Sequence, residues 1–239
     1  MNRLMPLSAG HLLAVALLTS PTHPAHADGK GSNDASVSIV HGVPGLTVDV
    51  YVNGGLFLED FLPGTITDPQ DLAPGTYDIA IVAANGDPED PAIEGSATVS
   101  GGVSYALVAH LAENGTPTLT PFVNDLDRAR RGGTRLAVRH TAAAPAVDVP
   151  LGYRFGPFTF HLGTILGLEN GEQAEATLWR GRYVAAVTLA NQPDAVVLGP
   201  AELRLRPGRY TAVYAIGSAA DGTLDLLVQT LRLERHDRD

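Results

Sequence analysis

The chain of 239 residues contains no cysteine, which excludes disulfide bonds, thiolate metal sites and cysteine nucleophiles. Charged residues make up only 18% of the chain and aromatic residues 6%, whereas 44% of the residues are hydrophobic. Such a composition is too apolar and too weakly charged for a disordered chain. The length fits one large or two small domains, each able to bury a core. Without disulfides, their stability must come from apolar burial and backbone pairing.

Long hydrophobic runs are also scarce, and the one near the N-terminus has the surroundings of a targeting signal. Residues 12–18 read LLAVALL, which is too short to span a bilayer as a helix. Arg3 precedes this run and Ala-His-Ala follows it at residues 25–27, as in a secretory signal peptide. We therefore predict that residues 1–27 are removed and that the mature protein is secreted, extracellular and without a membrane span. The charged C-terminal residues 232–239 show no wall-sorting or lipid-anchoring pattern.

Two segments of the remaining chain resemble each other. Residues 37–51 read VSIVHGVPGLTVDVY and residues 136–149 read LAVRHTAAAPAVDV, so each segment has a histidine, a proline and then Val-Asp-Val. The corresponding pairs, each 99 residues apart, are His41 with His140 and Asp49 with Asp148.

Two further matches extend the similarity along the chain. Residues 74–77 (PGTY) correspond to residues 180–183 (RGRY), 106 residues later, and we align residues 101–105 (GGVSY) with residues 206–210 (RPGRY), 105 residues later. A repeat of about 100 residues is too long for a solenoid unit and fits a duplicated small domain. We therefore predict four segments: a signal peptide (1–27), a first domain (28–126), a linker (127–133) and a second domain (134–239).

Within each copy, hydrophobic residues alternate with polar ones. Val48, Val50 and Val52 point to one face of a strand, and Asn53-Gly54 follows as a two-residue hairpin turn. Similar alternating segments recur, with turn residues at the spacing that is typical of an all-β sandwich. We predict an all-β fold with two tandem immunoglobulin-like antiparallel β-sandwich domains. Residues 171–179 are the only short candidate for a helix.

The order His-x-x-Pro, Val-Asp-Val-Tyr-Val, Pro-Gly-x-Tyr and a late Gly-x-x-Tyr strand resembles the family called domain of unknown function 4397. The resemblance covers essentially the whole mature chain as two copies, and RHTAAAPAVDV at residues 139–149 looks like the form common in actinobacterial members. It implies secreted bacterial modules with an immunoglobulin-like sandwich fold, often in tandem, and it brings no established activity. Pro150 departs from the pattern, because the first copy has Tyr51 there. Since proline cannot donate to a ladder, we expect that strand to lie at an edge or to end early.

Four residues of the repeated motif are the candidates for metal binding or acid–base catalysis. His41 and His140 share the parity of the apolar residues in their strands, so each ring points inward at a strand end. In one interpretation, each ring works with Asp49 or Asp148 as a metal ligand or a catalytic base. In the other, the ring nitrogens bond carbonyls of the following loop and the histidine is structural. The aspartates have the opposite parity to their neighbouring valines, which favours the structural interpretation.

An acidic loop is the one candidate for a calcium site. Asp87, Glu89 and Asp90 could hold Ca²⁺ through oxygen ligands, although the loop lacks the regular Asp-x-Asp-x-Asp-Gly order. A solvated loop is the alternative. The sequence contains neither HExxH nor GxSxG. We therefore predict no catalytic residue, no cofactor and no transition metal.

Charge is distributed very unevenly along the chain. Residues 28–127 contain 15 acidic residues and one lysine, for a net charge of −14, whereas residues 128–239 contain 11 acidic residues and 14 arginines, for a net charge of +3. The two domains could therefore meet through opposite charge, within one chain or between chains. An acidic protein with an extracellular address is a poor binder of nucleic acid.

We expect a secreted, non-enzymatic protein that binds a cell-surface, cell-wall or other extracellular ligand through its loops or strand edges. Tandem sandwiches, an export signal and the lack of a catalytic motif favour this hypothesis, although a sandwich fold alone implies no function. The alternative is an extracellular hydrolase or metal-dependent enzyme whose site at a domain end uses His41 or His140 with a nearby aspartate. A passive structural spacer is a third hypothesis.

Overall fold

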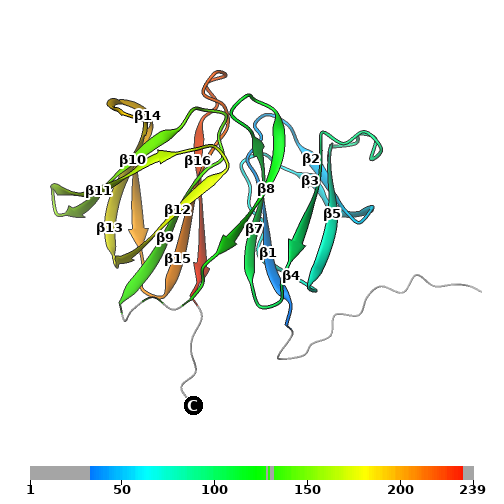
Figure 1. Ribbon diagram of the computed structural model, residues 1–239, viewed down its shortest axis with the longest axis horizontal. Coiled ribbons are helices and arrows are strands. Elements are labelled where there is room, and N and C mark those ends of the chain that lie inside the picture. Colours follow the sequence, from blue (N-terminus) through cyan, green and yellow to red (C-terminus); the bar gives the residue numbers. More distant parts are fainter. Residues whose placement is uncertain (1–32, 128, 130–131, 234–239) are drawn as a thin grey trace, which may run out of the picture. The chain divides into compact units, whose positions relative to one another are not determined.

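The computed structural model describes residues 33–127, 129 and 132–233. The predicted signal peptide lies outside these residues, and so does part of the predicted linker. The described part of the chain folds into sixteen β-strands and no helix (Figure 1), which confirms the predicted all-β class. The strands form four sheets of four strands each. Among the described residues there is thus no helix long and apolar enough to cross a membrane.

The first sandwich contains β1 (Ala35–His41), β2 (Val48–Val52), β3 (Gly55–Phe61), β4 (Gln70–Leu72), β5 (Gly75–Ala83), β6 (Ile93–Val99), β7 (Ser104–Leu111) and β8 (Pro117–Asn124). One sheet has the order β4-β1-β7-β8, and the other has the order β3-β2-β5-β6. Alternate side chains of both sheets form one buried aliphatic core, which includes Val37, Val50 and Leu107. The predicted Asn53-Gly54 turn joins β2 to β3, with positive φ at both residues.

The second sandwich contains β9 (Gly133–His140), β10 (Val147–Phe155), β11 (Phe158–Leu168), β12 (Glu172–Trp179), β13 (Gly181–Leu189), β14 (Gln192–Leu205), β15 (Arg209–Ile216) and β16 (Asp225–Arg232). Its sheets have the orders β12-β9-β15-β16 and β11-β10-β13-β14, so the topology of the first sandwich is repeated strand for strand. In each copy one pair of strands, β1 with β7 and β9 with β15, is parallel, and the other pairs of named strands are antiparallel. One sheet of each sandwich is therefore mixed.

Two local predictions for the second copy are wrong. The helix candidate at residues 171–179 is strand β12, because Ala174, Ala176 and Leu178 alternate with polar residues and the whole strand pairs with β9. The strand with Pro150 neither lies at an edge nor ends early, since β10 continues to Phe155 between β11 and β13. The ladder between β10 and β13 is interrupted between Asp148 and Leu151, so Pro150 has no partner on β13 and is paired only with Thr164 on β11.

The strand registers also correct the alignment of the two copies. His41 pairs with Ala109 on β7, and His140 pairs with Ala215 on β15, so these strands correspond with an offset of 106 residues. Tyr210 is therefore equivalent to Ser104, not to Tyr105 as the sequence match predicts. The two tyrosines lie on opposite faces of their sheets, Tyr105 packing against the core of the first sandwich.

A third hydrophobic core lies between the sheet β4-β1-β7-β8 and the sheet β12-β9-β15-β16. From the first sandwich it includes Val40, Val108 and Phe122, and from the second it includes Tyr210 and Tyr214. Hydrogen bonds cross the same boundary, from the Gln229 side chain to Ser38 and from the Asn170 side chain to the carbonyl of Leu111. The described strands thus form one compact unit with three cores, while the predicted boundaries at residues 126 and 133 stay predictions.

Candidate functional site

The two motif histidines are buried at the ends of β1 and β9 and make the same bond. The Nε2–H group of His41 donates to the carbonyl of Leu46 at 2.8 Å, and that of His140 donates to the carbonyl of Pro145 at 3.0 Å. Burial lowers the pKa of both rings below the ordinary value, although these carbonyl bonds oppose the shift. In both rings the Nδ1 atom is buried without a hydrogen-bond partner in the described structure. Each ring is therefore neutral and fastens the loop that follows its strand.

The two motif aspartates also have equivalent roles. One carboxylate oxygen of Asp49 accepts the N–H of Asp60 at 2.8 Å, and the equivalent oxygen of Asp148 accepts the N–H of Gly167 at 2.8 Å. The second oxygens accept the N–H groups of two asparagines, Asn85 at 3.3 Å and Asn191 at 2.9 Å. All four donors have positive φ. A carboxylate that accepts two such N–H groups stabilises turns that the backbone alone disfavours.

The structure does not bring the histidine and the aspartate of either copy together. No hydrogen bond or ion pair joins His41 to Asp49 or His140 to Asp148 in the described residues. The ring N–H and both carboxylate oxygens bond backbone groups of their own sandwich. This arrangement supplies neither a base oriented by a carboxylate nor a set of metal ligands.

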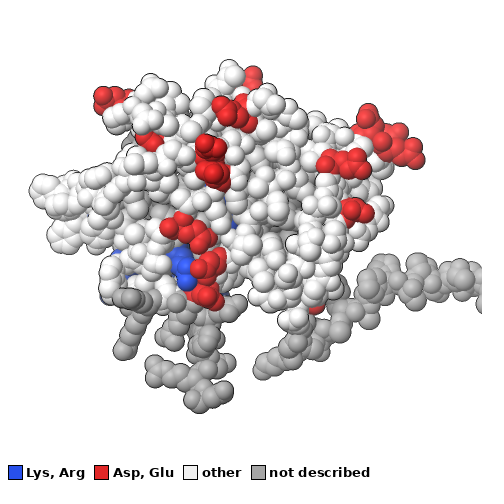
Figure 2. Space-filling view, viewed as in Figure 1, with Lys and Arg blue, Asp and Glu red and all other residues white. Residues whose placement is uncertain are grey.

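The acidic loop is exposed and its carboxylates do not converge. One oxygen of Asp87 accepts the N–H of Glu89 at 2.9 Å, and the Asp87 carbonyl accepts the N–H of Asp90. Within the described residues no three histidine or carboxylate side chains gather in a way that could hold a metal ion. Acidic side chains far outnumber basic ones on the face shown in Figure 2. The loop therefore adds to the negative surface of the first sandwich.

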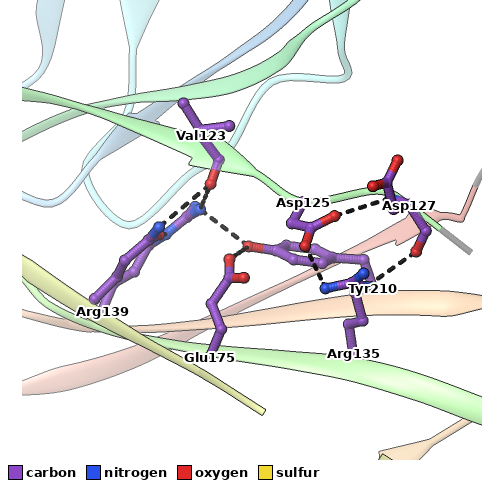
Figure 3. A network of polar contacts seen from close by, with 8 residues as sticks. Val123, Asp125, Asp127, Arg135, Arg139, Glu175 and Tyr210 are labelled. Atoms are coloured by element: carbon purple, nitrogen blue, oxygen red, sulfur yellow. Dashed lines mark hydrogen bonds and ion pairs between the residues drawn. The ribbon is translucent and has the colours of Figure 1, made fainter. Parts of the chain in front are cut away.

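Arg139 is a buried cation that the sequence pattern does not reveal. It precedes His140 on β9 and is 0% exposed. Its guanidinium donates to five acceptors: Gln173 Oε1 (3.0 Å), Tyr214 OH (2.7 Å), Val123 O (3.3 Å), Asn124 Oδ1 (2.7 Å) and Tyr210 OH (3.1 Å). Figure 3 shows its side chain reaching the Val123 carbonyl of the first sandwich. Because these acceptors belong to both sandwiches, Arg139 ties one to the other across the third core.

Aromatic rings and further polar groups complete this network. The guanidinium of Arg139 lies 4.8 Å from the ring centre of Phe122 and 5.1 Å from that of Tyr214, which adds cation–π attraction. The Tyr210 hydroxyl donates to the Glu175 carboxylate at 3.1 Å. Burial raises the pKa of both tyrosine hydroxyls, with Arg139 opposing the shift. The tyrosines therefore stay protonated and can donate. Beside them, Arg135 binds Asp125 (Figure 3).

An exposed aromatic hairpin is a second feature that the repeated motif does not predict. Phe155 and Phe158 lie opposite each other where β10 turns into β11, and both are largely exposed. The signal for it was present, because the offset between the copies grows from 99 to 106 residues after the Val-Asp-Val motif. An increase in offset marks extra residues in the second copy.

Solved structures similar to this chain share little sequence with it. The Bacillus anthracis TIE protein is 11% identical over 77% of this chain and 33% of that protein, with a TM-score of 0.27. A candidate cell adhesion protein from Bacteroides ovatus is 10% identical over 85% of this chain and 98% of that one (TM-score 0.28). Another from Bacteroides fragilis is 8% identical over 85% and 99% (TM-score 0.22). This chain spans about a third of the length of the TIE protein.

No match was found among curated protein sequences. A family model does match residues 35–150, which include the whole first sandwich and the start of β10. That the second sandwich is a further copy of the same family, and of the actinobacterial form, stays a prediction. Through residues 35–150 the chain belongs to the family described as "Domain of unknown function (DUF4397)".

Proposed function

We propose that the mature chain is a secreted, non-enzymatic module that binds an extracellular partner through surfaces that differ between its two sandwiches. The observation that carries this proposal is the duplication of the histidine and aspartate bonds. His41 and His140, like Asp49 and Asp148, bond equivalent backbone groups in both copies. Residues that do the same structural work twice are poor candidates for one catalytic site.

Secretion is part of the same proposal. The signal-peptide pattern of residues 1–27 supports it, and so does a cysteine-free chain that is stabilised by three apolar cores. The rigid connection through Arg139 and the third core supports a binding role as well, because it fixes the surfaces of the two sandwiches in one unit. A partner can then contact both without the entropy cost of ordering a flexible linker.

A retention experiment tests this function. Purified residues 28–239 are incubated with intact cells and with isolated cell-wall material, and the protein that remains after washing is measured. We expect saturable retention at micromolar concentration. A protein that is folded but not retained by either material overturns the proposal.

A double variant separates binding from the enzymatic alternative. His41→Gln with His140→Gln removes both candidate bases, and the retained fraction should match that of the parent as long as circular dichroism shows a folded protein. If the folded double variant loses retention, the histidines belong to the binding or catalytic site and the structural assignment is wrong.

A further inference from the structure

The hairpin between β10 and β11 differs in length from the hairpin between β2 and β3 in the first sandwich. In the first sandwich, the N–H group of Asp60 binds Asp49 and lies 11 residues after it. In the second, the N–H group of Gly167 binds Asp148 and lies 19 residues after it. The second hairpin is therefore eight residues longer. It projects at the left of Figure 1. Because the first sandwich closes an equivalent core without these residues, the fold does not need them.

The end of the long hairpin is apolar and uncovered by the described residues. Phe155 and Phe158 are 68% and 64% exposed, and Phe160 follows them on β11 with its ring also exposed. We call these three residues the phenylalanine tip. The projecting hairpin is white in Figure 2, which means that no charged side chain covers it on that face. Adjacent exposed apolar side chains of this size mark an interaction surface.

An apolar groove continues from the tip between the edge strands β11 and β12. Leu162 and Leu178 line it, with Tyr153, Tyr183 and Trp179 at one end. Trp179 is 68% exposed. The phenylalanine tip and the groove thus form an apolar surface at one end of the second sandwich.

Three arginines cross the outer face of the same sheet directly behind the tip. Arg154, Arg182 and Arg204 are cross-strand neighbours on β10, β13 and β14, and we call them the arginine row. Their parity is opposite to that of Tyr183, which faces the core. Neighbouring strands are about 4.8 Å apart, and like charges directly opposite one another destabilise a sheet. A negatively charged partner against this face removes that repulsion.

Two further arginines make this end of the second sandwich more positively charged. Arg180 and Arg206 lie in or beside the turns at this end of the sheet and are exposed. Glu202 lies on the same outer face as the arginine row and forms an ion pair with Arg154. On the other side of the sandwich, Asp125 is bound by Arg135. Since residues 28–127 carry a net charge of −14, an anionic surface repels the first half of the chain and attracts this end.

We propose that the phenylalanine tip and the arginine row bind the surface of a lipid bilayer that contains anionic lipids. The rings enter the boundary between headgroups and acyl chains, and the guanidinium groups contact headgroup phosphates. Exposed aromatic rings beside basic side chains are the pattern of proteins that lie in this interface. The inference rests on the proposed function, because it names the partner of the binding module. A second copy fits less well, since a copy that met the phenylalanine side chains would leave the arginine row, on the opposite face of the hairpin, without an anionic partner.

The experiment uses residues 28–239 with vesicles of phosphatidylcholine alone or mixed with phosphatidylglycerol. Trp179 is the single tryptophan of the chain and lies at this end, so its fluorescence reports directly on entry into an apolar phase. We expect the emission to shift to shorter wavelength, and the protein to sediment, with the vesicles that contain phosphatidylglycerol. Added salt should weaken this binding. Neither a shift nor sedimentation with either vesicle overturns the inference.

Two variants and a matched control locate the surface. Phe155→Ser with Phe158→Ser should lower the affinity for anionic vesicles by about tenfold or more. Arg182→Gln with Arg204→Gln should abolish the preference for anionic over neutral vesicles. Leu56→Ser alters another exposed apolar residue, 51% exposed, in the short hairpin of the first sandwich, and should leave the affinity unchanged. All five side chains are exposed, so the unfolding midpoints should stay at the parental value.

Two further outcomes would contradict the inference in different ways. A dimer that forms without lipid and disappears in the Phe155→Ser, Phe158→Ser variant assigns the tip to a second copy. Retention on cell-wall material without vesicle binding assigns the module to a polymeric partner, and the proposed function then stands alone. If the protein is retained neither on cells nor on cell-wall material and binds no vesicles, both the proposed function and this inference are wrong.

Discussion

Equivalent aspartates hold equivalent turns in the two sandwiches, but the hairpins that they anchor differ. Asp49 binds a short hairpin with a two-residue turn, and Asp148 binds one that is eight residues longer and has an aromatic end. Tyr77 and Tyr183 show the same constancy, since each hydroxyl donates at 2.7 Å to the carbonyl four residues earlier. The comparison separates residues that build the fold from residues that are free to serve a function.

The surfaces that the sandwiches turn toward each other have become different. Four positions with small side chains in the first sandwich have large ones in the second: Ser36, Val40, Ser104 and Val108 correspond to Arg135, Arg139, Tyr210 and Tyr214. Large side chains on one sheet fill the space left by small ones on the other, as close packing requires. The two copies are therefore complementary, which explains how two similar sandwiches share a third core.

The edge strands β3 and β11 of the two sandwiches differ in their charged residues. In the first sandwich β3 contains Glu59 and Asp60, and charged residues protect an exposed edge against pairing with other chains. In the second, β11 has eleven residues without an aspartate, glutamate, lysine or arginine. Both edge strands expose apolar side chains, Leu56 on β3 among them, but β3 also carries charged residues and β11 does not.

The largest loss of stability is expected when Arg139 is replaced by the residue type of its equivalent in the first sandwich. Arg139→Val gives the second sandwich the residue type that the first has at Val40. The change leaves Asn124 and Gln173 without their donor and opens a cavity in the third core. We expect the free energy of unfolding in urea to fall by about 3 kcal/mol.

Arg182→Val is the control for this substitution. It removes an exposed arginine from the same sandwich and should change the free energy of unfolding by less than about 0.5 kcal/mol. An Arg139→Val protein as stable as this control would show that the network around the guanidinium contributes nothing and that packing alone joins the sandwiches.

A smaller and equal effect is expected at the two aspartates. Asp49→Ala and Asp148→Ala each remove a buried carboxylate that accepts two backbone N–H groups. Each should lower the free energy of unfolding by about 2 kcal/mol, whereas Asp90→Ala, in an exposed loop, should have little effect. Thermal unfolding of the three variants measures this. If one motif aspartate is costly to remove and the other is silent, the two copies do not share a scaffold.

Much of this scaffold could be predicted from the sequence because it depends on local patterns. The alternation around Val48 and the Asn53-Gly54 turn indicate strands and a hairpin without knowledge of the partners. Local patterns give the wrong prediction where the structure of a segment depends on the strands beside it. Residues 171–179 become a strand because β9 offers an edge, and Pro150 is tolerated because the ladder to β13 is interrupted beside it.

The candidate sites show the same division. The parity of the strand residues predicts that His41 and His140 face inward, and both are buried in the structure, but the pattern does not identify the carbonyls that they bind. The burial and the bonds of Arg139 could not be predicted from the sequence, because its partners Asn124 and Tyr214 are distant in sequence and come together only when the two sandwiches pack. Its identity as a buried cation is a property of the third core.

The smallest effect expected here depends on pH and on the motif histidines. Burial lowers the pKa of His41 and His140 below the ordinary value of 6.5 for histidine, and the pKa of His110, which donates to the Leu111 carbonyl, is lowered for the same reason. As the pH falls below 6.5, the unfolded rings take up protons that the folded rings resist. The unfolded state then binds more protons, so the free energy of unfolding decreases. The stability from these neutral rings is complete above this value and is lost below it.

Urea unfolding at about pH 7 and about pH 5.5 measures this dependence. His41→Gln and His140→Gln should each reduce the loss of stability between the two pH values, and by similar amounts, because their rings have the same burial and the same kind of partner. His161→Gln replaces an exposed ring on β11 and should leave the loss unchanged. Unequal losses would show that the neighbours of one ring, and not the repeated motif, govern its protonation. A double variant with undiminished acid sensitivity would transfer the effect to His110 and the carboxylates.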